Sequence, residues 1–163
     1  AYMNEYPAWA AENSEFDGQA VETKRSISMR GVRARGIRIP QDERDRFKFV
    51  DFQRCSFVTG GTMENLLDLN ARVEASEIEM GNRAGYGVHY LMPYRGASPD
   101  TDYDFIIMRH YYSAKKRSDI VASYPEYRDM MNEKGYWDEF RSNATCGSQS
   151  TYRVEWLYNT FAN

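Results

Sequence analysis

Residues 47–58 constrain the fold of this chain more than any other segment does. Apolar side chains occupy both sets of alternating positions near the start of this stretch, which predicts a β-strand that is apolar on both faces. A pair of glycines follows the strand and ends it. Thr62 can then cap a helix, and apolar residues recur at helical spacing until Gly81, so the pattern predicts a helix over residues 63–80.

Three more strands and a second helical region follow. Residues 86–92 and 103–112 have the pattern of strands, and the turn-forming residues between them predict a hairpin. A polar linker over residues 113–118 leads to apolar residues at helical spacing over 120–140, which predict one long helix or two short ones. Residues 151–158 alternate as a fourth strand, so the expected order is β, α, β, β, α, β.

This order is typical of the ferredoxin-like arrangement of the α+β class. Right-handed crossovers then produce a four-stranded antiparallel sheet with spatial order 4-1-3-2 and two helices on one face. We expect residues 47–163 to form this domain. The other face of the sheet would carry large apolar side chains, which are costly to leave in water, so we expect a second layer there. Either a partner subunit or the N-terminal segment could supply it.

Residues 1–46 differ in composition from the rest and are expected to form an N-terminal extension, or arm. Acidic residues come first, and six positive charges follow with no acid between them. The apolar residues alternate too irregularly here to predict a strand. The charges either face solvent or dock on a neighbouring subunit or an anionic surface. The candidate partner-binding residues are Trp9, Lys24, Arg25, Arg30, Arg33, Arg35 and Arg38.

Composition and charge exclude two classes of protein. The 163 residues include 21 Lys and Arg against 24 Asp and Glu, a net charge of -3, which excludes a strongly basic nucleic-acid-binding domain. No run approaches the roughly 20 apolar residues that cross a bilayer, so the chain is not expected to be transmembrane. It begins at Ala1 instead of Met, which fits a mature protein whose signal peptide was removed. A chain trimmed for another reason would begin in the same way.

Cys55 and Cys146 are the only cysteines of the chain. In a sheet of 4-1-3-2 order, the C-terminal end of the first strand lies beside the N-terminal end of the last, so this topology predicts a disulfide. A bridge that closes about 90 residues would contribute roughly 4 to 5 kcal/mol, and it implies an oxidising compartment and hence a periplasmic or secreted protein. The alternative is two buried free thiols. Neither spacing resembles a zinc site, and no metal is expected.

Several features of residues 47–158 carry a resemblance to a known superfamily. They are Cys55 at the end of the first predicted strand and Cys146 just before the last one, a helix with Asn70 and Glu74 on its polar side, the Asp-Tyr-Asp-Phe run at Asp102–Phe105 and the Tyr-Tyr-Ser run at Tyr111–Ser113. On these residues the chain resembles the dimeric α+β barrel superfamily, in particular uncharacterised secreted bacterial proteins of that type. The resemblance implies two sheets paired face to face, and functions that range from cofactor-free monooxygenases to haem enzymes.

The chain has two histidines, His89 in the second predicted strand and His110 in the third. Each could serve as a general base or a haem ligand, or could be a structural or exposed side chain. His110 is the stronger candidate because Arg109 and Tyr112 beside it can hold an anion or a polar ring. Strand alternation places His110 and Tyr112 on one face and Arg109 on the other. These three residues are the candidate catalytic residues.

Two further groups each have a functional and a structural interpretation. Asp100, Asp102 and Asp104 could hold calcium, but they lack the glycine and the distal glutamate of an EF-hand loop, which favours loop solvation and turn capping. Met130 and Met131 favour gap filling in a core over a cofactor site.

No constellation of residues in the sequence specifies a reaction. We therefore expect an extracytoplasmic, non-catalytic module that forms a homo-oligomer or serves as an accessory subunit of a larger assembly, without a cofactor. On that hypothesis, deleting residues 1–46 should weaken assembly while the core stays folded. The alternative, implied by the resemblance, is a small-molecule enzyme of the monooxygenase type or a haem-binding protein, with a cavity near His110, Arg109 and Tyr112 as its site.

Overall fold

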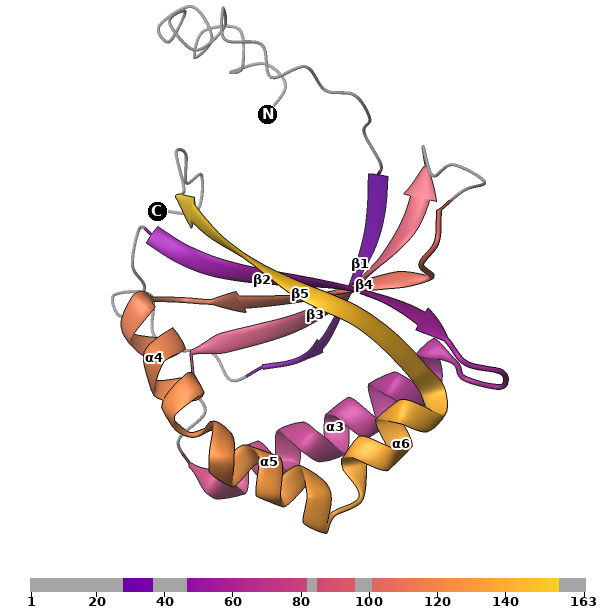
Figure 1. Ribbon diagram of the computed structural model, residues 1–163. Helices are drawn as coiled ribbons and strands as arrows, with labels where there is room; N and C mark the ends of the chain where they lie inside the picture. The colour runs from indigo at the N-terminus through magenta and orange to yellow at the C-terminus, as the bar shows by residue number, and fades with distance from the viewer. Residues whose placement is uncertain (1–27, 37–46, 82–84, 96–100, 156–163) are drawn as a thin grey trace, which may run out of the picture.

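The computed structural model describes residues 28–36, 47–81, 85–95 and 101–155 of the chain (Figure 1). Within these residues the fold is α+β, as the sequence predicts, with one five-stranded sheet and four helices. The strands are β1 (Ser28–Arg35), β2 (Phe47–Phe57), β3 (Tyr86–Arg95), β4 (Phe105–Tyr111) and β5 (Ala144–Glu155). The helices are α3 (Met63–Met80), α4 (Ala114–Ala122), α5 (Tyr124–Glu133) and α6 (Tyr136–Asn143).

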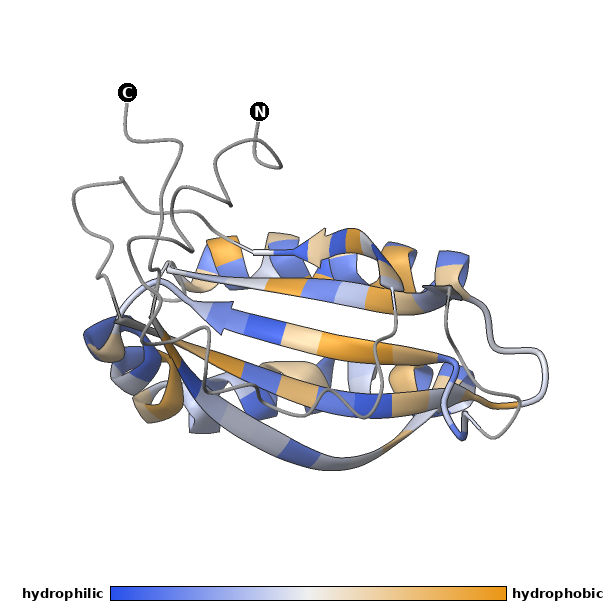
Figure 2. Ribbon diagram, turned by 90° about the horizontal axis from the view of Figure 1, so that it is seen from above, coloured by the Kyte–Doolittle hydropathy of each residue, from blue (hydrophilic) through white to orange (hydrophobic). Residues whose placement is uncertain are grey.

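The strands are ordered β1-β3-β4-β2-β5 across the sheet, and all neighbouring strands are antiparallel. The four strands predicted from the sequence keep the spatial order predicted for them, and β1 is added beside β3. The described helices lie against one face of the sheet (Figure 1), and the view onto its other face shows the strands in front of them (Figure 2). In its described part, the sheet therefore has a helix-covered face and a helix-free face.

The helix predicted over residues 63–80 is confirmed at both ends. Thr62 precedes α3, and its hydroxyl accepts a hydrogen bond from a backbone N–H of the first turn. Gly81 ends the helix with a φ of 75°, in the left-handed region that glycine adopts without strain. The turn before α3 also requires a glycine, because a Cβ on Gly61 would lie 2.0 Å from the carbonyl oxygen of Asn143.

The core lies between the sheet and the helices and consists of two clusters. In the larger one, side chains from the sheet pack against Leu66 of α3, and both Leu66 and Phe105 are fully buried. The second cluster lies among α3, α5 and α6 and includes the buried side chain of Met131. Met130 packs against the same cluster, so both methionines fill the core, as the sequence favours.

Strand β1 is absent from the sequence prediction, which treats this segment as part of an arm. Its pairing with β3 contains register shifts near both ends, and charged residues interrupt its apolar pattern. Two of these charges have partners on α3. Arg33 donates to Glu74 at 3.0 Å, and Arg35 lies 3.8 Å from Glu77. The charges that obscure the strand in the sequence therefore bind a helix that is distant along the chain.

The segment after β4 also differs from the prediction, because it forms three helices instead of a linker and one or two helices. The Ser113 hydroxyl accepts a backbone hydrogen bond of the first turn, so α4 begins inside the expected linker. Pro125 lies in the first turn of α5, and Gly135, with a φ of 69°, separates α5 from α6. Strand β5 begins earlier than predicted, at Ala144. The expected four strands and two helices are thus five strands and four helices among the described residues.

Cys55 and Cys146 form a disulfide between β2 and β5, which confirms the predicted pairing. The two residues are also register partners in the sheet. Disulfides are typical of proteins in oxidising compartments. None of the described helices has the length and apolar character needed to cross a membrane.

Candidate functional site

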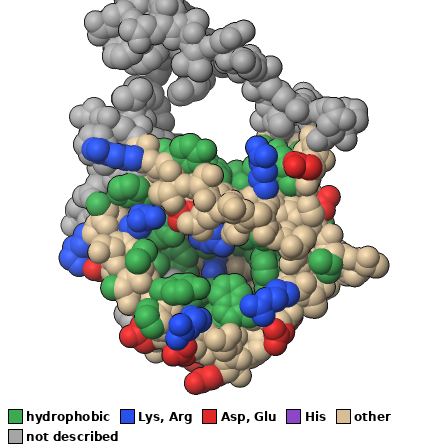
Figure 3. Space-filling view, viewed as in Figure 1, with side chains coloured by type: hydrophobic (Ala, Val, Ile, Leu, Met, Phe, Trp, Pro, Cys, Tyr) green, Lys and Arg blue, Asp and Glu red, His purple; other side chains and the backbone are tan. Residues whose placement is uncertain are grey.

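A cavity of about 460 Å³ lies between the helix-covered face of the sheet and the helices. Figure 3 shows a hollow there, with positively charged side chains inside it and hydrophobic side chains around it. The volume is in the range of small-molecule sites. We call six of its sheet side chains the polar floor: Arg35, Asp51, Gln53, Arg109, Tyr111 and Gln149. We call six apolar and aromatic side chains that α4, α5 and α6 contribute to the lining the roof: Ile120, Val121, Tyr124, Met131, Trp137 and Phe140.

The polar floor follows from the register of the sheet. Successive side chains of a strand point to opposite faces, so Asp51 and Gln53 of β2 lie on the same face. Asp51 is the register partner of Arg109 in β4, and Gln53 is the register partner of Gln149 in β5. Four polar side chains from three neighbouring strands therefore lie together under the helices.

Arg109 is held in the floor by two amide groups. Its Nη1 donates to the Oε1 atoms of Gln53 and Gln149, each at 3.2 Å. The Gln53 side chain is itself oriented, because its Nε2 donates to the carbonyl oxygen of Gly147 at 2.9 Å. No ion pair between described residues includes Arg109. Within the described part of the chain, the guanidinium of Arg109 therefore has neutral partners.

Asp51 is the one carboxylate among the described residues that line the cavity, and it is 1% exposed. The Tyr111 hydroxyl donates to its Oδ2 at 3.0 Å, and the Thr151 hydroxyl donates to its Oδ1 at 2.7 Å. Arg117 of α4 lies 4.0 Å from the same carboxylate. Burial and the nearby charge of Asp51 raise the pKa of Tyr111 to about 12, so its hydroxyl stays a donor even at the alkaline pH where a tyrosine in water ionises. The charge of Asp51 is thus compensated within the protein.

Arg35 brings a second cation into the floor from β1. Its side chain is 11% exposed and lies 3.8 Å from Glu77, a fully buried carboxylate of α3. Arg35 also donates from Nη2 to the Tyr127 hydroxyl at 2.9 Å. Tyr86 donates to the same Glu77, and burial raises the pKa of Tyr86. Arg35 therefore belongs to the interior, contrary to the expectation that it faces solvent or a partner.

The structure separates the three candidate catalytic residues. Arg109 lines the cavity, whereas His110 and Tyr112 do not, because side chains alternate between the two faces along this strand. The His110 ring lies 5.2 Å from the ring of His89 and 5.1 Å from the ring of Tyr112. Gly87 leaves the space that His110 occupies, since a Cβ there would lie 2.4 Å from the imidazole. Neither histidine lines the cavity, so a haem bound by His110 would lie outside it.

The other candidate partner-binding residues have different placements. Arg30 is exposed in β1, whereas Arg33 forms its 3.0 Å ion pair with Glu74. Because the Arg35 side chain is mostly buried, these three arginines of β1 do not form one exposed set of charges. The remaining candidates lie outside the described residues: Trp9, Lys24, Arg25 and Arg38.

The acidic residues before β4 have structural partners. The Asp104 carboxylate accepts a hydrogen bond from the Phe57 N–H at 2.7 Å, and the Asp104 N–H donates to the Cys55 carbonyl oxygen at 2.9 Å. The carbonyl oxygen of Asp102 accepts a hydrogen bond from a serine hydroxyl of β2. Asp100 lies outside the described residues, among which no group of three potential metal ligands occurs. These contacts favour the turn-capping interpretation of Asp104.

Sequence reasoning does not identify Gln53, Gln149 or Asn70 as part of a site. The glutamines are ordinary polar residues of a strand pattern, and nothing local marks them. Asn70 is expected on the polar side of its helix, but it is buried and donates to the Tyr90 hydroxyl. Asp51 did carry a signal, as an acid between apolar residues of a strand. A buried acid in that position indicates nearby donors.

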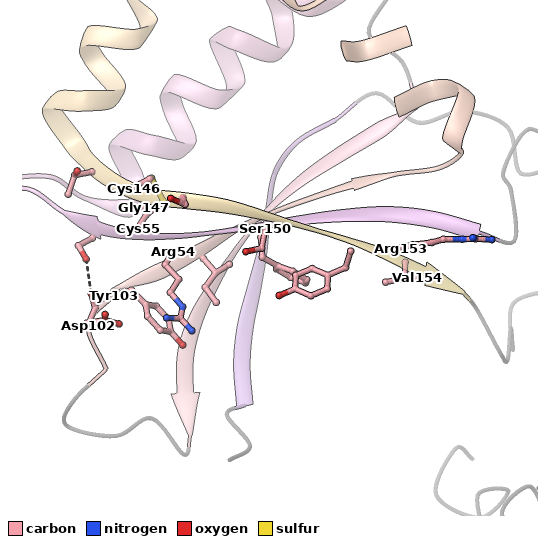
Figure 4. A pocket seen from close by; sticks show the side chains of 15 residues that line it. Arg54, Cys55, Asp102, Tyr103, Cys146, Gly147, Ser150, Arg153 and Val154 are labelled. Atoms are coloured by element: carbon pink, nitrogen blue, oxygen red, sulfur yellow. Dashed lines mark hydrogen bonds between the residues drawn. A yellow bond between two sulfur atoms is a disulfide. The ribbon is translucent and has the colours of Figure 1, made fainter. Parts of the chain in front are cut away.

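An open groove of about 1070 Å³ lies on the helix-free face of the sheet. Figure 4 shows Arg54 and Tyr103 side by side in this groove, with the disulfide near one end. The Arg54 guanidinium lies 5.4 Å from the centre of the Tyr103 ring, and the rings of Phe52 and Tyr152 are 5.8 Å apart. Tyr152 is 53% exposed. The groove therefore presents aromatic surface to solvent.

Comparisons with protein-family models, with curated proteins and with solved structures found no match to this chain. The resemblance to the dimeric α+β barrel superfamily accordingly remains a hypothesis. The function has to be inferred from the cavity and the groove.

Proposed function

We propose that this protein binds a small organic ligand in the cavity between the sheet and the helices. The observation that carries the proposal is the combination of a polar floor with an apolar and aromatic roof around one space. In sites of this kind, a few polar groups orient the ligand, and buried apolar surface supplies affinity. The amide and guanidinium groups of the floor can bind polar groups, and the rings of the roof can pack against apolar ones.

Binding is better supported than catalysis as the role of this cavity. The described residues that line it include no histidine and no free thiol, the side chains that most often act as general base or as nucleophile. Asp51 already accepts hydrogen bonds from Tyr111 and Thr151. The monooxygenase-like enzyme and the haem-binding protein are therefore the weaker alternatives.

We place this function outside the cytoplasm, in the periplasm or in the secreted fraction, because a structural disulfide persists in oxidising compartments. The strand order of β2, β3, β4 and β5, with the helices on one face, supports a ferredoxin-like core that is extended by β1. Membership of the dimeric α+β barrel superfamily is part of the same proposal.

A substitution at the mouth of the cavity tests ligand binding. Val121 lines the cavity and is 57% exposed, so Val121→Trp should narrow the opening. The neighbouring Ala122 is exposed and does not line the cavity, which makes Ala122→Trp the matched control. We expect small organic compounds that raise the melting temperature of the wild-type chain to do the same for Ala122→Trp. Their affinity for Val121→Trp should fall by about tenfold or more.

Two outcomes of this screen would contradict the proposal. One is a broad library without any compound that stabilises the wild-type chain. The other is a set of binders whose affinities are the same in Val121→Trp and Ala122→Trp, because such compounds bind elsewhere.

A second function, self-association as a homo-oligomer or accessory subunit, is favoured by the groove on the helix-free face. Its exposed aromatic surface around Tyr152 is costly to leave in water. If this face pairs with a second copy, Tyr152→Asp should lower the native mass measured by sedimentation. Ile78→Asp is the control, because Ile78 is 61% exposed on α3, in the helix layer. A monomeric wild-type chain would rule out self-association without affecting the ligand-binding proposal.

A further inference from the structure

The charged side chains that line the cavity indicate the chemical class of its ligand. This inference rests on the proposed function. We propose that the ligand is a monocarboxylate with an apolar body, and that Arg109 binds its carboxylate group. Three observations carry this assignment: the balance of charges around the cavity, the open edge of the Arg109 guanidinium, and the composition of the roof.

Among the described residues, the cavity lining has one more cation than the acids around it can pair. Arg35, Arg109 and Arg117 all line the cavity. Arg35 is paired with Glu77, and Arg117 lies within ion-pair distance of Asp51. Arg109 is left without an acidic partner in the described part of the chain. A partly buried charge without a counter-charge is costly, so a single negative charge on a ligand would be favourable here.

The contacts of Arg109 leave one edge of its guanidinium available. Both glutamine oxygens are bound by Nη1, so within the described residues Nη2 and Nε have no hydrogen-bond partner. Although Asp51 is the register partner of Arg109, the guanidinium is bonded toward Gln149 of β5 instead. A planar guanidinium binds a carboxylate through two parallel N–H bonds, and the edge formed by Nη2 and Nε supplies such a pair.

The roof favours a carboxylate that carries an apolar body over a bare inorganic anion. Its side chains are aliphatic or aromatic, and Trp137 and Phe140 add large rings. A phosphate or sulfate ion at Arg109 would leave these side chains in contact with water, whereas an apolar body would cover them. A phosphate ester would bring more negative charge than Arg109, the one cation of the floor without an acidic partner among the described residues, compensates.

A matched pair of compounds tests this assignment on the full chain. 3-Phenylpropanoate has the carboxylate and an apolar body, 3-phenylpropanamide is its neutral counterpart, and acetate has the carboxylate alone. Calorimetry at neutral pH should show that the propanoate binds at least about tenfold more tightly than the amide. Acetate should bind more weakly than the propanoate, because it leaves the roof uncovered.

Two substitutions at the floor should abolish the preference for the acid. Gln149→Glu places a carboxylate beside Nη1 of Arg109, and Gln149 is exposed on an edge strand, where the change is tolerated. It should weaken propanoate binding about tenfold and leave amide binding within about twofold. Arg109→Gln should have the same effect. Arg54→Gln is the control, because Arg54 lies in the groove on the other face.

The outcomes separate this inference from the function on which it rests. Equal affinities for the acid and the amide, or a preference that survives both floor substitutions, would overturn the role of Arg109 and leave a ligand-binding cavity standing. The same holds if only neutral compounds bind in a manner sensitive to Val121→Trp. If no compound of any class binds, the proposed function fails together with the inference.

Discussion

Tyr111 and Asp51 show, at the level of single residues, how the polar floor depends on protonation. A tyrosine ordinarily ionises near pH 10.0, whereas burial and the charge of Asp51 raise the pKa of Tyr111 to about 12. Between these values the unfolded chain releases the proton and the folded chain keeps it. The stability that this residue contributes is therefore fully present below about pH 10 and is lost as the pH rises through about 12.

Tyr111→Phe is expected to change stability in two ways. At neutral pH the free energy of unfolding should fall by about 1 to 3 kcal/mol, because the buried Asp51 loses a donor. Above about pH 10 the variant should lose less further stability than the wild-type chain does. Urea denaturation at neutral pH and near pH 11 measures both effects. Tyr152→Phe, at a side chain that is 53% exposed, is the control and should change neither. If Tyr111→Phe and the wild-type chain lose the same free energy of unfolding above about pH 10, the raised pKa of Tyr111 does not contribute to stability.

Arg109 could be selected from the sequence, but its surroundings could not be predicted. Its neighbours along the chain, His110 and Tyr112, lie outside the cavity, and strand alternation alone predicts that separation. The residues that bind it, Gln53 and Gln149, are 56 and 40 residues away in the sequence. Contacts at that distance depend on the strand order and on the register of the sheet. The local pattern contains neither.

At the level of elements, a buried ion pair joins strand β1 to helix α3. Arg35 has little exposed surface, and its partner Glu77 has none. Removing one member of such a pair leaves the other charge buried, which costs more than the pair contributes. The sequence alone predicts that the core stays folded when residues 1–46 are deleted, whereas this ion pair leads us to expect that the deletion destabilises the core. The deletion removes β1 and Arg35 while Glu77 stays in the interior.

Arg35→Met should lower the free energy of unfolding by about 3 kcal/mol, because Glu77 would remain buried without this cation. Arg30→Met removes an exposed arginine of the same strand and should change stability by no more than about 0.5 kcal/mol. Adding Glu77→Met to Arg35→Met should restore part of the loss. Chemical denaturation of the three variants measures these changes in the free energy of unfolding. If the two arginine substitutions lower it equally, the ion pair between Arg35 and Glu77 does not stabilise the fold.

The elements that the sequence predicts well are those with local signals. Helix α3 has a cap at Thr62 and a stop at Gly81, and both ends are confirmed. The three inner strands of the sheet are apolar enough to be recognised. The two edge strands are not, since the sequence pattern predicts no strand at β1 and starts β5 too late. An edge strand has a neighbouring strand on one side only and tolerates charged and polar residues. Such residues interrupt the alternation of apolar and polar positions from which a strand is predicted.

On the scale of the whole molecule, the disulfide joins parts of the chain that are 91 residues apart. A bridge of that span restricts the unfolded chain and contributes about 4 to 5 kcal/mol on the chain-entropy model. Complete reduction should therefore lower the free energy of unfolding by this amount. A chain with both cysteines replaced by alanine should have the lower stability and show no response to reductant. Unchanged stability of the fully reduced wild-type chain would contradict the prediction.

The pairing of β2 with β5 also determines when the protein can fold. Contacts between these strands join residues that are distant in the sequence, such as Asp51 and Thr151, which are 100 positions apart. During synthesis from the N-terminus, β2 leaves the ribosome long before β5 exists, so the polar floor is incomplete until nearly the last described residue has been made. Pairings of such long range form slowly, because chain entropy is lost before the new contacts compensate for it. Closure of the β2–β5 ladder, and not formation of the helices, should therefore limit the folding rate.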